Sequence, residues 1–192
     1  MIANFLKYLE DKFALTDAER ELIADACTVK KLRKRQYLLQ EGDLWQKNAF
    51  ISKGILRSYR VDDKGHEHIF QFCPENWWTG DPEGYFTENP AKLNIDALED
   101  SELVLIDKKE YQRILKAIPA LSDFSKTLLE RSFVASQVRI HCLISSTAEE
   151  KYQEFIKTYP NIINRVPQHM IASYLGISAE TLSRVRNTMV KK

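Results

Sequence analysis

The sequence is poor in cysteine. Its three cysteines, Cys27, Cys73 and Cys142, lie far apart and form no Cys-x-x-Cys pair. This spacing argues against a disulfide framework and against a structural zinc site, and it predicts a chain that folds in a reducing cytoplasm. No metal ion and no cofactor are expected.

Long apolar runs and an excess of one charge are also absent. No segment approaches the roughly 20 apolar residues that a membrane-spanning helix needs. The first residues, Met1–Phe13, mix acids into an apolar pattern that is typical of an amphipathic helix and not of a signal peptide. With 192 residues, 44% of them hydrophobic, and a net charge of +1, the composition predicts a globular domain plus a small second one.

Short runs of alternating polarity, separated by turn residues, fill the region from about Val29 to Ile106. Residues that tolerate tight turns, such as Glu41-Gly-Asp43 and Asp62-Asp-Lys-Gly65, separate these runs. The pattern predicts an antiparallel sandwich or barrel. The predicted strands are Tyr37–Leu39, Ala49–Ser52, Ile55–Val61, His68–Phe72, Leu93–Ala97 and Leu103–Ile106.

Helical patterns flank this region. A capping box, Thr16-Asp-Ala-Glu19, starts a second helix after the amphipathic N-terminal one, and a short helix over Lys108–Ala117 ends before Pro119. A further capping box, Thr147-Ala-Glu-Glu150, starts a helix that ends near Tyr159-Pro160.

A long helix is predicted between these elements, from about Ala120 to Ser145. Apolar residues recur in it at the a and d positions of a heptad, with Arg131 as the one break. Such a seam predicts a homodimer, and the alternative is a helix packed on its own barrel. The predicted seam consists of Leu121, Phe124, Leu128, Ala135, Val138 and Cys142.

The last quarter of the chain has the pattern of a helix-turn-helix. Pro167 suits the first turn of a helix whose buried face is formed by Ile171, Ala172 and Leu175. Gly176 can take the left-handed conformation that ends a helix, and Ser178 can cap the next one.

Polar residues cover the outer side of this second helix, as a helix in a DNA major groove requires. Residues 165–192 carry five Lys and Arg against one acid on a nearly neutral chain, which favours DNA over an ordinary helical pair. The candidate base-reading residues are Glu180, Ser183, Arg184 and Asn187. The candidate phosphate contacts are Arg165, Ser178, Arg186, Lys191 and Lys192.

With strands, a long helix and a helix-turn-helix in this order, the chain resembles the Crp/Fnr superfamily of bacterial transcription regulators. The most specific segments are Ile51-Ser-Lys-Gly-Ile-Leu-Arg57 and Ile177-Ser-Ala-Glu-Thr-Leu-Ser-Arg184. The resemblance implies an α+β fold: an antiparallel, jelly-roll-like β-roll (double-stranded β-helix) over residues 1–118, a dimerisation helix over 119–146 and a winged helix-turn-helix over 147–192. Ala179 stands where the family has its first arginine, so a different operator is expected.

The resemblance also implies an effector site, a phosphate-binding cassette within Gly80–Asn94. Asp81 replaces the family's glutamate, and Ala91 stands where its arginine should be. Lys92 lacks the planar fork that grips two phosphate oxygens. The candidate pocket is therefore Gly80, Asp81, Glu83, Ala91 and Lys92, with cyclic AMP not expected and another small-molecule effector left open.

Two further pairs carry weaker signals. His66 and His68 share one side of a predicted strand, which would suit a metal or haem, although a solvent-facing position beside the hairpin turn is favoured. Trp77 and Trp78 are expected to pack in the core or to cover a pocket.

These features predict a homodimeric, sequence-specific transcription regulator that reads a near-palindromic operator, and not an enzyme. The predicted partners are double-stranded DNA and a second copy of the chain; RNA polymerase is left open and no membrane is expected. The alternative is a ligand- or partner-sensing module without specific DNA binding.

Overall fold

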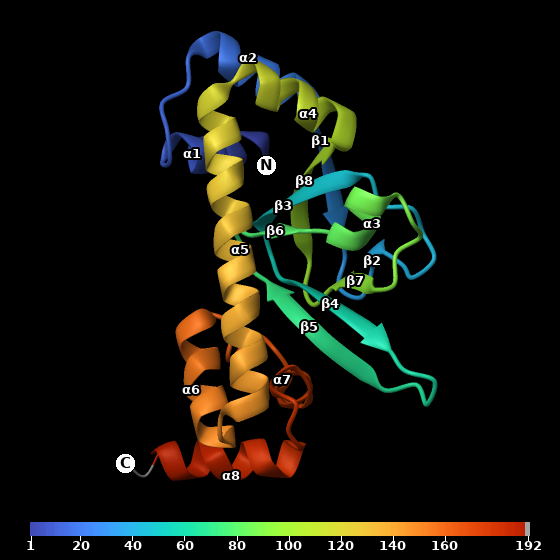
Figure 1. Ribbon diagram of the computed structural model, residues 1–192, viewed down its shortest axis with the longest axis vertical. Coiled ribbons are helices and arrows are strands. Elements are labelled where there is room, and N and C mark those ends of the chain that lie inside the picture. The colour runs from blue at the N-terminus through green and yellow to red at the C-terminus, as the bar shows by residue number, and fades with distance from the viewer. Residues whose placement is uncertain (191–192) are drawn as a thin grey trace. The chain divides into compact units, whose positions relative to one another are not determined.

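The computed structural model describes residues 1–190, and the chain forms two compact units. Unit 1 consists of residues 1–61 and 70–127, and unit 2 of residues 62–69 and of the chain from Leu128 onward. Among the described residues, no helix combines the length and the apolar character required to cross a lipid bilayer. Figure 1 shows the elements of both units.

Two four-stranded antiparallel sheets form most of unit 1. Their strand orders are β1-β8-β3-β6 and β2-β7-β4-β5, which confirms the predicted β-roll. The strands are β1 (Cys27–Leu32), β2 (Tyr37–Leu39), β3 (Lys47–Lys53), β4 (Leu56–Val61), β5 (Glu67–Cys73), β6 (Trp78–Thr79), β7 (Asn94–Ala97) and β8 (Ser101–Asp107).

Strand β1 was not predicted. It follows directly on the preceding helix and forms an edge of its sheet, with Cys27 opposite Ile106 and Leu32 opposite Ser101. Lysines at positions 30 and 31 interrupt its apolar pattern. Charged side chains are common on edge strands, where they oppose pairing with other chains, and this hides the strand from a hydrophobicity pattern.

The first sheet has a core on each face. One core lies between the sheets and contains Leu39, Ile51, Ile95 and Leu103. The other lies under the helices, where Phe50, Val104 and Ile106 pack against Phe5, Leu9 and Ile23. The helices of this layer are α1 (Ile2–Glu10), α2 (Asp17–Ala26) and α4 (Lys108–Ala117), while α3 (Pro82–Thr87) belongs to the cassette.

The predicted core role of the two tryptophans is seen in both cores. Trp78 packs edge-on against Phe5 and Phe50, with ring centroids 5.5 and 5.6 Å apart. Trp77 packs against the core between the sheets.

Unit 2 contains three helices after the long one, α6 (Ala148–Thr158), α7 (Gln168–Leu175) and α8 (Ala179–Val190). The Thr147–Glu150 capping box is present at the start of α6. Gly176 ends α7 with φ 65° and ψ 35°, the left-handed conformation that glycine adopts without strain. Between residues 128 and 190 no strand is found, so the wing that the family resemblance implied is not part of the described fold.

The long helix α5 (Pro119–Ser145) corrects the predicted seam. Leu121 is 1% exposed and lies in the core of unit 1, and the Phe124 ring contacts Tyr8 and Phe13 there. Residues of the same chain already pack against these two side chains, so a second copy cannot contact them there. The reason is that the first turns of α5 lie over the N-terminal helices, which a heptad pattern cannot reveal.

Candidate functional site

Helix α8 is held against the other helices of unit 2 by an apolar inner face. Leu182 is 0% exposed, and Ile171 and Leu175 of α7 are also buried. The rings of Phe155, Tyr159 and Tyr174 pack beneath, with centroids 5.2 to 5.6 Å apart. This core fixes which side of α8 faces outward.

The outward side of α8 carries the predicted base-reading residues. Their side chains are exposed and recur at three- and four-residue steps, which places them on one face of the helix: Glu180, Ser183, Arg184 and Asn187. Within the described chain, this face also extends to the exposed residue Thr188.

Hydrogen bonds within the first turns of α8 organise this face. Ser178 caps the helix by accepting from the Thr181 backbone N–H at 3.2 Å, and the Arg184 guanidinium donates to the Thr181 hydroxyl at 3.2 Å. The pKa of Glu180 is lowered by a hydrogen bond from its own backbone N–H, by a hydrogen bond with the Ser178 side chain and by the positive charge of Arg184. Glu180 is therefore ionised and can accept a hydrogen bond from a base at neutral pH.

The predicted phosphate contacts are placed less uniformly. Arg165 precedes α7 and is exposed, as is Ser178 at the start of α8, whereas Arg186 is half-buried on the flank of that helix. Lys191 and Lys192 lie outside the described residues. Arg165, Ser178 and Arg186 thus belong to three different parts of the helix-turn-helix.

A clip between the start of β5 and α7, both in unit 2, was not predicted from the sequence. The Ser173 hydroxyl donates to the Glu67 carbonyl oxygen at 2.8 Å and accepts from the Ile69 N–H at 3.2 Å. The Arg139 guanidinium donates to the carbonyl oxygens of Ile69 and Tyr174 at 3.1 and 3.2 Å. Each contact joins a side chain to backbone, so no motif in the sequence indicates it.

In the cassette, the start of α3 is tightly packed. Asp81 is 3% exposed and caps α3 by accepting from the Glu83 N–H at 3.2 Å, while its Oδ2 atom is buried without a hydrogen-bond partner. A side chain at Gly80 would place its Cβ 2.7 Å from the indole nitrogen of Trp45, so only glycine fits there. The cassette backbone is thus fixed by packing.

The cationic groups of the cassette are already paired, which argues against a cyclic phosphate. Lys92 and Arg60 both contact the Glu83 carboxylate, at 2.5 and 3.7 Å, and these contacts lower the pKa of Glu83. Ala91 is 2% exposed and belongs to the core between the sheets. The residues present therefore offer neither the planar fork nor an unpaired charge at the expected position.

A buried ion pair on the second sheet was also missed. The Arg57 guanidinium donates to both Asp96 oxygens, at 2.8 and 3.0 Å, and their side chains are 7% and 9% exposed. The Arg57 guanidinium stacks 4.1 Å from the Tyr59 ring centroid, and burial raises the pKa of the Tyr59 hydroxyl. The sequence places Arg57 and Asp96 39 positions apart, so only the β4–β7 register reveals the pair.

The histidine pair lies at the turn, as the favoured interpretation expected. His66 and His68 are exposed, and one ring nitrogen of each lies close to the Asp62 carboxylate, His66 Nδ1 at 3.2 Å and His68 Nε2 at 3.0 Å. The hydrogen bond with His68 contributes most to lowering the pKa of Asp62, and the hydrogen bond from the His66 backbone N–H lowers it further. Across residues 1–190, no three His, Cys, Asp or Glu side chains are grouped so that they could hold a metal ion.

Comparison with known proteins finds similarity in both sequence and fold. Residues 29–117 match the cyclic nucleotide-binding domain family. The fold is similar to the solved structure of FixK2 from Bradyrhizobium japonicum, with a TM-score of 0.74, 17% identity and coverage of 86% of this chain and 85% of that one.

Relatives with curated names extend the similarity over most of the chain. The transcriptional activator Anr of Pseudomonas aeruginosa is 24% identical over 165 residues, which cover 80% of this chain and 67% of that protein. The cyclic AMP receptor protein of Thermus thermophilus is 20% identical, with coverage of 81% and 73%. Over most of its length the chain is thus similar to a transcriptional activator and to a cyclic AMP receptor protein, in agreement with the predicted regulator.

Proposed function

We infer that the chain regulates transcription as a homodimer that inserts α8 of each copy into the major groove of a near-palindromic operator. The observation that supports this most is the outward face of α8, where Glu180, Ser183, Arg184 and Asn187 are exposed together above an apolar inner face. A major groove about 12 Å wide accepts such a helix. Of the curated relatives described above, one is named as a transcriptional activator and the other as a receptor for cyclic AMP.

The residues of α8 divide by role. Arg184 can bond a guanine with two hydrogen bonds and Glu180 can accept from a cytosine amino group, so both would specify sequence. Arg165 and Arg186 would contact phosphates, which fix the register of the protein on the duplex without reading bases. Lys191 and Lys192 remain candidates for the same role.

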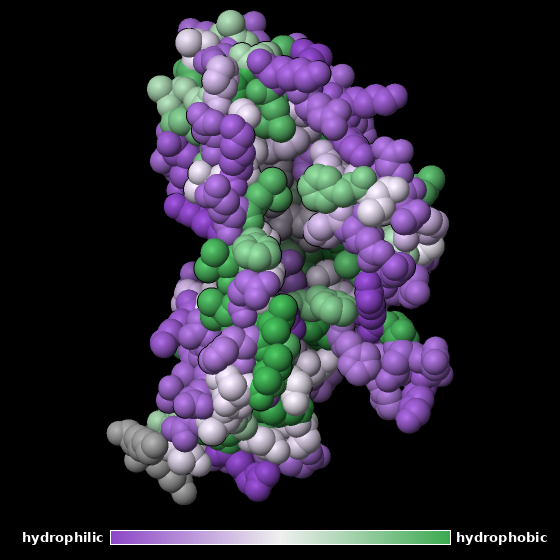
Figure 2. Space-filling view, viewed as in Figure 1, coloured by the Kyte–Doolittle hydropathy of each residue, from purple (hydrophilic) through white to green (hydrophobic). Residues whose placement is uncertain are grey.

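Exposed apolar side chains on α5 support the dimer. Leu129, Phe133, Ile140 and Ile144 are 59%, 65%, 50% and 81% exposed, and steps of four, seven and four residues place them on one side of the helix. Figure 2 shows hydrophobic side chains along the described part of this helix. An apolar stripe of this kind is typical of a surface covered by another chain. A second copy would set the two α8 helices about 34 Å apart, one turn of DNA.

The effector of this regulator is proposed to be a small molecule other than cyclic AMP. Ala91 replaces the cassette arginine, and Lys92 and Arg60 are paired with Glu83. With those charges engaged, a cyclic phosphate would have to displace Glu83 to gain a cation, and that exchange costs the existing ion pairs.

Selection of bound oligonucleotides from a random pool tests this function. The purified protein should select a palindromic consensus, and a Phe133→Asp variant should lose both dimerisation and that selection. Failure to select any consensus would favour a sensing module whose helical end does not read DNA.

A matched pair of variants then tests the roles on α8. Arg184→Ala should cost about 1–3 kcal/mol against the selected operator and relax specificity at one base pair of each half-site. Arg186→Ala should weaken binding to selected and scrambled DNA alike and reduce the salt dependence by about one phosphate contact. Equal losses on both DNAs for Arg184→Ala would contradict its base-reading role.

A further inference from the structure

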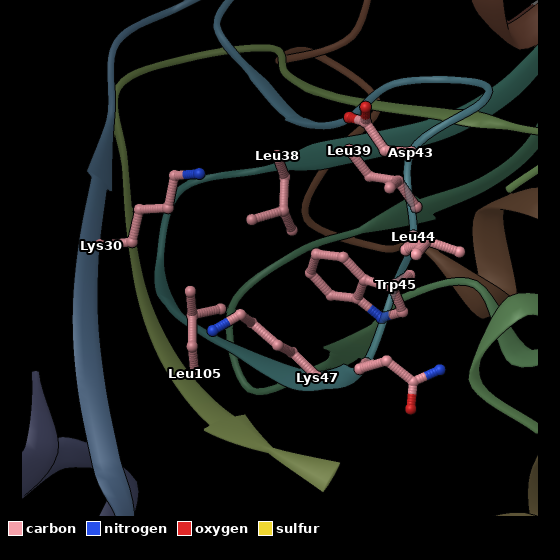
Figure 3. Close-up of a pocket in the computed structure, with 9 residues that line it drawn as sticks. Lys30, Leu38, Leu39, Asp43, Leu44, Trp45, Lys47 and Leu105 are labelled. Carbon is pink, nitrogen blue, oxygen red and sulfur yellow. The ribbon is translucent and has the colours of Figure 1, made fainter. Parts of the chain in front are cut away.

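Unit 1 contains a cavity of about 320 Å³ that shares no residue with the candidate cassette pocket. Side chains from β1, β2, β8, the start of β3 and the loop before β3 line it. Figure 3 shows Lys30 and Lys47 entering this cavity from two different strands, with Leu38, Leu105 and Trp45 around it. The volume lies at the lower end of the range of small-molecule sites, about 300–1,000 Å³.

The two lysines lie on the core-facing side of the first sheet. Thr28 pairs with Leu105, which also pairs with Ala49 of β3. Lys30 is two residues beyond Thr28, and Lys47 is two residues before Ala49. Because side chains alternate along a strand, both lysines share the side on which Leu105 lies in the core between the sheets. Charged groups on such a side are costly unless something pairs with them.

The pairing of these charges is incomplete. The Lys47 ammonium is 2.7 Å from the Asp107 carboxylate, and Asp43, the one acid in the cavity lining, accepts from the Gln40 N–H. Lys30 is half-buried, and its ammonium makes no hydrogen bond or ion pair with any described residue. One ammonium group at the rim of the cavity is therefore available to an anion.

The rest of the lining is apolar. Leu38, Leu39, Trp45 and Leu105 are each 2% to 7% exposed, and Leu44 at the rim is 68% exposed. This surface can cover a hydrocarbon or an aromatic ring, which an inorganic anion does not have. A fitting ligand therefore combines one negative charge with a short apolar body.

We propose that this cavity binds an amphipathic organic carboxylate, with its carboxylate on Lys30 and its apolar part against Leu38, Trp45 and Leu105. Binding of the carboxylate in this cavity does not depend on the proposed function. The role of the cavity as the effector site of the regulator does rest on that function.

Hydrogen bonds connect the lining to the cassette. The Ala91 N–H donates to the Asp43 carbonyl oxygen at 2.8 Å, and the Gly42 N–H donates to the Ala91 carbonyl oxygen at 2.8 Å. The Gln46 side chain donates to the Gly84 carbonyl oxygen at 3.3 Å. A ligand that moves the loop before β3 would thus act on the cassette at two points, Gly84 and Ala91.

The binding site is tested by nuclear magnetic resonance of the full chain, with hexanoate as the probe. The indole N–H signal of Trp45, identified by its loss in Trp45→Phe, should shift and saturate with hexanoate at millimolar concentrations. Uncharged hexanamide should bind more weakly. Lys30→Gln should weaken hexanoate binding roughly tenfold or more, since it removes a hydrogen bond between charged groups.

Lys31→Gln is the matched control. Lys31 is the next residue on β1, points to the other side of the strand and contacts Glu102 at 3.7 Å, so its removal should leave hexanoate binding unchanged. The proposal is overturned if the Trp45 signal does not move, if hexanamide binds as well as hexanoate, or if Lys30→Gln and Lys31→Gln act alike.

A second measurement separates this site from the proposed function. Saturating hexanoate should change the affinity of the wild-type protein for its selected operator and should not change that of Lys30→Gln. Saturable hexanoate binding without an effect on DNA affinity keeps the binding site and rejects its role as effector site. Failure to select any operator both with and without hexanoate would reject the proposed function and leave the binding result standing.

Discussion

Unit 1 and unit 2 use their polar side chains in opposite ways. Of the described residues, every buried polar or charged one lies in unit 1: Arg57, Ser58, Asp81, Asp96 and Ser101. The buried side chains described for unit 2 are all aliphatic or aromatic, and its arginines lie at the surface or half-buried. Unit 1 thus directs polar groups into the protein, where they fix one arrangement, whereas unit 2 keeps them outward for a partner.

The tryptophans allow the two units to be measured separately. All three, Trp45, Trp77 and Trp78, lie in unit 1. Tryptophan fluorescence during denaturation therefore follows unit 1, whereas helical circular dichroism and DNA binding also follow unit 2.

The largest effect is expected from breaking the buried pair of unit 1. Arg57→Met leaves the Asp96 carboxylate buried without its main partner, which should lower the free energy of unfolding by about 3–5 kcal/mol. The midpoint of the tryptophan fluorescence transition in urea measures this loss.

The double variant Arg57→Met with Asp96→Leu is the control for this change. It removes both charges together and should recover most of the stability, because no uncompensated charge remains. A double variant as unstable as Arg57→Met alone would mean that packing, and not charge, dominates at this site.

The next effect concerns the apolar core of unit 2. Leu182→Ala leaves a cavity beneath α8 and should cost roughly 2–5 kcal/mol. Operator binding should be lost while the tryptophan transition keeps its midpoint. Thr188→Ala, on the exposed side of the same helix, should change stability by no more than about 0.5 kcal/mol.

A smaller effect is expected at the clip between the start of β5 and α7. Ser173→Ala leaves the Ile69 N–H and the Glu67 carbonyl oxygen without their partner, which should cost about 1–2 kcal/mol locally. Hydrogen exchange of the Ile69 amide should accelerate accordingly. Ser146→Ala, at a half-buried serine of the same unit, should leave that exchange rate unchanged.

Local patterns in the sequence predicted most elements of both units. The Thr16 and Thr147 capping boxes, Gly176 and the short helix over Lys108–Ala117 depend on residues within one or two turns, and the structure has them all. The outward face of α8 follows from the same helical spacing.

Features that depend on distant residues were not predictable in this way. The Arg57–Asp96 pair requires the register of β4 and β7, and the Ser173 clip joins residues more than a hundred positions apart. The predicted seam on α5 was wrong at Leu121, because a heptad records that a face is apolar and not which neighbour covers it. The same limit hid β1, whose Lys30 faces a cavity that only the assembled sheets create.

The smallest effect compares one motif in both units. The capping boxes at Thr16 and Thr147 have the same geometry, with N–H to glutamate distances of 2.8 Å in each, so Thr16→Ala and Thr147→Ala should each cost about 1 kcal/mol. Only Thr16→Ala should shift the tryptophan transition.

The backbone N–H groups of the two threonines lower the pKa of Glu19 and Glu150. A lowered pKa in the folded state means that the glutamates contribute stability above their ordinary pKa, about 4.3, and lose it as the pH falls through the lowered value. The cost of each substitution should therefore shrink in acid, and a cost independent of pH in both units would show that the threonine hydroxyl acts without its glutamate.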